Sequence, residues 1–138
     1  MPPRTDSLPV DCPACGHDRL AFRVPDPLRE HAPTGEAAAI CPRCLTLSEA
    51  DSAPPDPDFS AIIEAFPEGE AGAAMALAVG LVVDSLALNR DAIGACLAYV
   101  GDRGDDPWLV LERLAASGAV QADADLDRAR RQLQQLLR

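Results

Sequence analysis

The 138-residue sequence predicts an α+β fold, in which a small N-terminal β unit precedes a bundle of about five helices. Two Cys-x-x-Cys pairs stand among short stretches of alternating apolar and polar residues, which are typical of small strands. A proline-rich break follows, and behind it apolar residues recur at helical spacing. We therefore expect a β unit at residues 1–50, a linker at 51–58 and a helical domain at 59–138.

The two cysteine pairs are the strongest chemical signal in the chain. Two residues between paired cysteines let both sulfurs face one metal ion at about 2.3 Å. Four thiolates complete the tetrahedral shell of Zn²⁺ and leave no open position for a substrate. Residues 1–50 are thus predicted to form a zinc ribbon around one structural ion. Its ligands are Cys12, Cys15, Cys41 and Cys44. The alternative, a redox dithiol, lacks the βαβ context of thioredoxin-like motifs.

Short extended pieces are expected around each cysteine pair, so that each pair forms a knuckle at the tip of a hairpin. Strands or single turns are predicted at residues 20–24, 28–31, 37–40 and 45–47. Gly16 follows the first pair, where a tight turn often needs positive φ. Leu45 takes that place after the second pair, so the two knuckles are not equivalent there.

Three prolines in four residues make the linker stiff and extended, because proline continues neither a helix nor a central strand. Behind the linker, apolar periodicity predicts five helices. Asn89 and Asp106 are candidate caps for the third and fourth. The second helix is apolar on most faces and is expected to be central. The five are expected at residues 59–66, 70–88, 90–101, 107–118 and from Asp123 or Asp125 onward.

The chain is acidic, with 22 acids against 12 basic residues, all of them arginine, and a net charge of -10. Two explanations of this composition compete, a GC-rich genome and a cytoplasm of high salt concentration, and we expect that both apply. The strongest apolar stretch, residues 71–83, is shorter than the roughly 20 residues of a membrane helix. No signal peptide is evident, so we expect a cytoplasmic protein with no membrane partner, whose paired thiols stay reduced and available for metal.

The other reactive or charged residues have simpler structural interpretations. His17 and His31 are expected on the surface or packed at a knuckle, and Cys96 is expected to act as a small buried hydrophobe. Trp108 could anchor a partner, but packing is the favoured role. A basic cluster near the C-terminus could contact phosphates, although a solvated helix face is favoured. Its members are Arg128, Arg130, Arg131 and Arg138.

The first knuckle, Cys12-Pro-Ala-Cys15-Gly16, resembles the Cys-Pro-x-Cys-Gly signature of small zinc-finger proteins abundant in halophilic archaea. The wider chain resembles an uncharacterised haloarchaeal family of that kind. The matching segments are residues 24–30, 41–47, 58–60 and 84–90. The resemblance implies zinc ligation by the four cysteines and carries no known activity, since such families are domains of unknown function.

No phosphate loop or catalytic triad is recognisable, and a non-enzymatic binding or adaptor protein is the favoured function. In such an adaptor, zinc would keep the knuckle surface rigid for a macromolecular partner, and we favour a protein partner over nucleic acid. The alternative is a nucleic-acid-associated transcription or translation factor, and an enzyme is the least supported class. Phosphate contacts would come from Arg19, Arg23, Arg29 and Arg43. Arginines on one exposed face would favour nucleic acid, whereas arginines that scatter or pair with acids would favour the adaptor.

Overall fold

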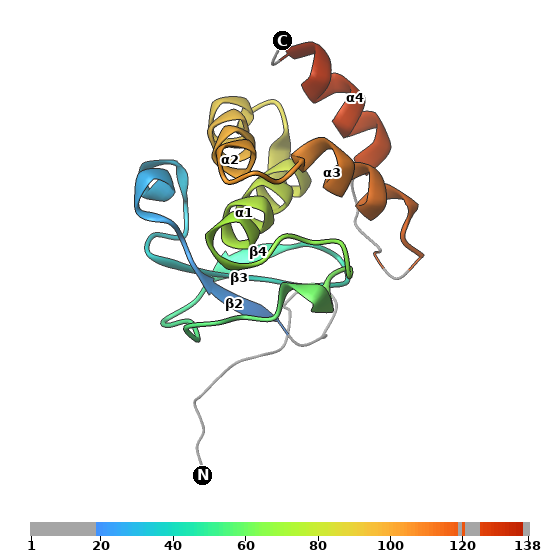
Figure 1. Ribbon diagram of the computed structural model, residues 1–138. Helices are drawn as coiled ribbons and strands as arrows, with labels where there is room; N and C mark the ends of the chain where they lie inside the picture. The colour runs from blue at the N-terminus through green and yellow to red at the C-terminus, as the bar shows by residue number, and fades with distance from the viewer. Residues whose placement is uncertain (1–18, 119, 121–124, 137–138) are drawn as a thin grey trace.

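The computed structural model describes residues 19–118, 120 and 125–136 (Figure 1). This part of the chain has the predicted α+β architecture, with a small antiparallel sheet and several helices. The elements are the strands β2 (Leu20–Arg23), β3 (Ala37–Ile40) and β4 (Leu47–Glu49), the 3₁₀ turns η1 (Asp26–His31) and η2 (Phe59–Ala61), and the helices α1 (Gly69–Ser85), α2 (Arg90–Asp102), α3 (Pro107–Ala116) and α4 (Leu126–Leu136).

The sheet has the order β2-β3-β4, and both pairs of neighbouring strands are antiparallel. Leu20 lies opposite Ile40, and Ile40 lies opposite Leu47. The start of β2, the end of β3 and the start of β4 therefore meet at one end of the sheet. The turn that carries the second cysteine pair joins β3 to β4 at this same end.

Helix α1 is the centre of the molecule, and it lies between the sheet and α2 (Figure 1). Every residue from Ala71 to Val82 is buried, as expected for a helix that is apolar on most faces. Two glycines let it approach its neighbours closely. A Cβ on Gly72 would lie 2.5 Å from the Phe59 ring, and one on Gly80 would lie 2.7 Å from Leu47. The helices thus pack directly on the sheet, and a single hydrophobic core contains residues from both.

The prediction of a two-turn helix at residues 59–66 is wrong. Only the short turn η2 forms there, and the Asp58 carboxylate caps it by accepting a hydrogen bond from the Ser60 N–H at 3.1 Å. The apolar residues of this segment are nevertheless buried, with Phe59 stacked on Phe66 at 5.8 Å between ring centroids. Because so short a helix is marginal by itself, the aromatic packing determines the backbone path.

Aspartates begin α3 and α4, as the sequence predicts. The Asp106 carboxylate accepts hydrogen bonds from the N–H groups of Trp108 at 3.0 Å and Leu109 at 3.3 Å. The Asp125 carboxylate accepts one from the Arg128 N–H at 3.1 Å, so Asp125 caps α4. The other candidate, Asp123, lies outside the described residues.

Asn89 precedes α2, but its side chain does not cap that helix. Its amide instead donates to the Leu81 carbonyl at 3.1 Å and to the Asp84 carboxylate at 3.1 Å. The Asn89 side chain therefore bonds to the last part of α1 and not to the start of α2. Among the described residues, no helix is both long and apolar enough to cross a bilayer.

We predict that Asp106→Ala lowers the free energy of unfolding by about 1 kcal/mol, because two N–H groups at the start of α3 lose their acceptor. Asp105→Ala is the matched control, since it removes the same charge from an exposed neighbour that makes no cap. Urea denaturation of both variants checks the prediction. Equal effects of the two substitutions would show that charge, and not capping, is responsible.

Candidate metal centre

The second cysteine pair lies on the tight turn between β3 and β4. Cys41 directly follows β3, and its N–H donates to the Thr46 carbonyl at 3.1 Å. The Cys41 carbonyl accepts a hydrogen bond from the Leu45 N–H at 2.8 Å. These two bonds close the turn and hold both cysteines at the end of the sheet.

Both sulfurs lie within hydrogen-bond distance of a polar group on the turn. The Cys44 N–H points at the Cys41 Sγ at 3.5 Å, and the Thr46 hydroxyl lies 3.0 Å from the Cys44 Sγ. Cys41 is buried and Cys44 is half-buried, so a metal held here would be partly shielded from water.

Leu45 adopts the left-handed backbone conformation that glycine usually provides in such a turn, with φ of 62°. This conformation costs a leucine about 1–2 kcal/mol. The side chain is fully buried in the core, which stabilises the fold by about 1.5–3 kcal/mol. Burial therefore compensates the backbone cost. The second knuckle therefore reaches positive φ without glycine.

The first cysteine pair, Cys12 and Cys15, and His17 lie outside the described residues. Within the described part of the chain, no group of three or more potential metal ligands converges. The structure therefore describes only half of the predicted ligand set. That half fits zinc in the chemistry of its donors, because two thiols on one turn supply half of a Cys₄ shell.

The register of the sheet restricts how far the first pair can lie from the second. Leu20 lies opposite Ile40, which immediately precedes Cys41. Cys15 is five residues before Leu20 in the sequence, and five residues span at most about 17 Å. The chain between Cys15 and Leu20 is therefore long enough for Cys15 to reach the knuckle that Cys41 begins.

The four arginines that the sequence offers for phosphate contacts differ in their surroundings. Arg19 donates to the Ser48 hydroxyl and to the Glu49 carbonyl, which fixes it along β4. Arg29 is 2.7 Å from the Asp26 carboxylate and 3.6 Å from that of Glu36.

Arg23 is exposed on β2, and Arg43 is half-buried in the cysteine turn.

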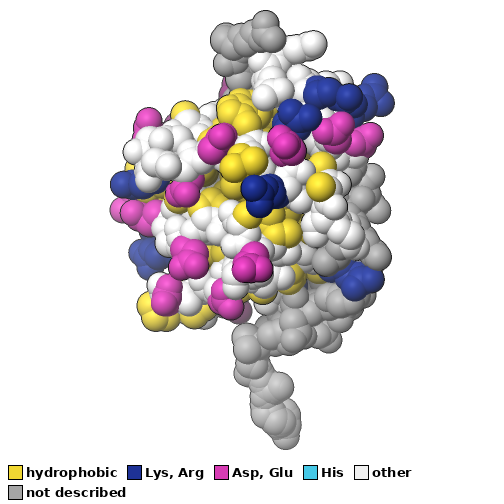
Figure 2. All heavy atoms as spheres, turned by 45° about the vertical axis from the view of Figure 1, so that its right-hand side comes forward, with side chains coloured by type: hydrophobic (Ala, Val, Ile, Leu, Met, Phe, Trp, Pro, Cys, Tyr) yellow, Lys and Arg dark blue, Asp and Glu magenta, His cyan; other side chains and the backbone are white. Residues whose placement is uncertain are grey.

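The C-terminal arginines lie on α4 beside an acid of the same helix. Arg130 and Arg131 approach the Asp127 carboxylate at 2.9 Å and 3.5 Å. The hydrogen bond from Arg130 holds the pKa of Asp127 below its usual value. Figure 2 shows a group of arginines at the upper right of the face in view, with acids beside them, and further arginines and acids elsewhere on that face. Arg128 is exposed on the same helix, and Arg138 lies outside the described residues.

The remaining candidates have structural roles. Cys96 is buried on α2, and burial raises the pKa of its thiol to about 12, so it stays protonated and unreactive at neutral pH. Trp108 is half-buried at the start of α3 and packs against the core. His31 ends η1 in a half-buried position.

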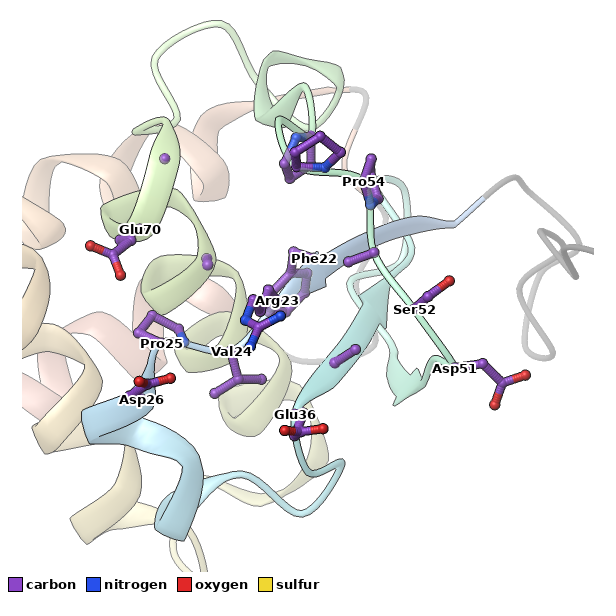
Figure 3. A pocket seen from close by; sticks show the side chains of 16 residues that line it. Phe22, Arg23, Val24, Pro25, Asp26, Glu36, Asp51, Ser52, Pro54 and Glu70 are labelled. Carbon is purple, nitrogen blue, oxygen red and sulfur yellow. The ribbon is translucent and has the colours of Figure 1, made fainter.

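Sequence reasoning missed a groove of about 790 Å³ beside β2. Strand β2, the proline-rich segment 51–57 and the start of α1 line this groove (Figure 3). The close-up places Phe22 and Arg23 between Glu70 on α1 and Pro54 on the segment. The available signal was the run of prolines itself, which indicates a rigid wall as readily as a linker.

We predict that Leu45→Ala and Leu45→Gly each lower the free energy of unfolding by about 2–5 kcal/mol, because both remove a fully buried side chain. At most positions glycine is about 1 kcal/mol worse than alanine. Here positive φ removes that difference, so Leu45→Gly is expected to be at least as stable as Leu45→Ala.

Chemical denaturation of both Leu45 variants gives the comparison. A glycine variant clearly less stable than the alanine variant would contradict the left-handed conformation of residue 45.

Comparisons with known proteins give one match. No curated protein and no solved structure matches this chain. A family model described as a family of unknown function, DUF6276, matches residues 11–137, which include all four cysteines of the two pairs. This confirms the expectation of an uncharacterised family. The chain therefore belongs to the DUF6276 family of unknown function.

Proposed function

We propose that this protein is a non-enzymatic adaptor in which one Zn²⁺ ion, bound by four cysteines, holds a surface for a protein partner. The proposal places it in the cytoplasm, where reducing conditions keep the thiols available for metal. The metal would supply folding energy and no catalysis, because four thiolates leave no open position on the ion. It would thereby make the N-terminal part of the chain a zinc ribbon.

Three observations support the zinc site. The Cys41–Cys44 turn carries two thiols, with a main-chain N–H beside one sulfur and the Thr46 hydroxyl beside the other. Leu45 provides the positive φ that a metal knuckle requires. The family match begins at residue 11, so it includes the first pair, and β2 starts at the end of the sheet where the second pair lies.

The observation that carries the choice of a protein partner is the engagement of the arginines. Arg29 pairs with the carboxylates of Asp26 and Glu36, which offset its charge, and hydrogen bonds to a hydroxyl and a carbonyl hold the Arg19 guanidinium along β4. The chain carries a net charge of -10, and a Cys₄ zinc centre adds a formal charge of about -2. Because binding to nucleic acid depends on neutralising phosphates, this balance opposes it.

The zinc site predicts one equivalent of Zn²⁺ per chain in freshly purified protein, measured by elemental analysis. Cys41→Ala is expected to lose the metal and to melt at a lower temperature, because the binding energy of a structural metal is folding energy. Cys96→Ala is the matched control, since it removes a buried cysteine that takes no part in the site. Loss of zinc from both variants, or from neither, would contradict the assignment.

The adaptor proposal predicts no saturable binding of single- or double-stranded oligonucleotides tighter than about 100 μM at the working salt concentration, the weak end of non-specific affinity. Fluorescence anisotropy of labelled oligonucleotides measures this directly. Tighter binding that disappears in Arg23→Ala and Arg43→Ala would overturn the proposal in favour of a nucleic-acid factor.

A further inference from the structure

Phe22 and Arg23 of β2 line the groove described above, and Ala21 precedes them on the same strand. The Val24 N–H donates to the Glu36 carbonyl at 2.8 Å, so Val24 and every second residue before it direct their main-chain groups toward β3. The N–H and C=O groups of Ala21 and Arg23 therefore point away from β3. No described strand pairs with this edge. Such an edge is a template for an added strand.

The proline-rich segment 51–57 forms a wall of the groove, and no main-chain hydrogen bond among the described residues joins it to Ala21 or Arg23. Pro54, Pro55 and Pro57 have no N–H and cannot pair with β2 as a regular strand would. Their fixed φ makes the wall stiff, so an incoming chain meets a surface that needs little ordering.

A charged residue and a proline, such as Arg23 and Pro25, also protect edge strands from unwanted pairing. That protective role needs neither a groove nor an opposite wall, and both are present here.

The rim of the groove carries more negative than positive charge. Its one lining arginine is Arg23, against four carboxylates from Asp26, Glu36, Asp51 and Glu70. Arg29 pairs with the first two of these, and Arg103 lies 3.5 Å from the last. Asp51 is exposed, and no described cation pairs with it. The remaining negative charge complements lysine or arginine on an occupant.

We propose that this groove binds an extended segment of a partner protein that carries lysine or arginine and adds as a strand to the Ala21–Arg23 edge. The inference rests on the proposed adaptor function and names the chemistry of the partner. Main-chain hydrogen bonds to the edge provide affinity, and the acidic rim provides selectivity.

The test uses the full-length zinc-bound protein and a short synthetic peptide that alternates arginine with threonine. Titration calorimetry measures affinity, and NMR follows the main-chain amides. The amide signals of Ala21 and Arg23 are expected to shift on binding and to exchange more slowly with solvent. Methylation of alternate peptide nitrogens is expected to weaken binding about tenfold, because it removes the N–H groups that pair with β2.

Charge variants separate the groove from the general acidity of the protein. The double variant Asp51→Asn, Glu70→Gln is expected to weaken binding about twofold to fivefold at low salt. Glu112→Gln is the matched control, because Glu112 is exposed on α3 and does not line the groove. A peptide with glutamate in place of arginine is expected not to bind.

Four results would overturn the groove assignment. They are the absence of binding, unmoved Ala21 and Arg23 amides, equal binding of the glutamate peptide, and an equal loss of affinity in Glu112→Gln. If any of these occurs while zinc content is one equivalent and oligonucleotides do not bind, only the groove assignment fails. If an oligonucleotide instead binds and shifts the same amides, the adaptor function fails with it.

Discussion

The structure depends on a leucine that belongs to two parts of the molecule at once. Leu45 supplies the left-handed turn of the cysteine knuckle, and its side chain is fully buried in the core that contains α1. A glycine would give the turn without the burial, and a leucine in an ordinary conformation would give the burial without the turn. The knuckle is therefore part of the hydrophobic core and not an appendage to it.

The sequence was informative where a local rule decides the structure. The strands on both sides of the second knuckle, the central position of α1 and the caps Asp106 and Asp125 all follow from local pattern. It failed where long-range packing decides. Residues 59–66 have helical spacing, yet the contacts of Phe59 with Phe22 and Phe66 determine their path. Asn89 was expected to cap α2, but its side-chain amide donates a hydrogen bond to the Leu81 carbonyl of α1, because the tight turn between the helices brings it back there.

The candidate sites were predictable to different degrees. Cysteine spacing indicates a metal ligand set, because that chemistry depends on residue type and separation. The groove was not predictable, since it requires the segment 51–57, the edge of β2 and the start of α1 to meet, and no local pattern encodes that. The placement of charged residues bears on both the choice of partner and the groove. Arg29, one of the arginines that could contact nucleic acid, pairs with two carboxylates, whereas four carboxylates and one arginine line the groove.

Hydrogen exchange of the α1 amides, measured with bound zinc and after chelation, tests most directly whether metal, sheet and helices form one unit. Because Leu47 of the sheet packs on Gly80 of α1 and Leu45 joins the same core, removal of zinc should accelerate exchange in α1 and β3 together. Exchange in α1 that is unchanged by chelation, while β3 opens, would contradict this account and would show two independent units.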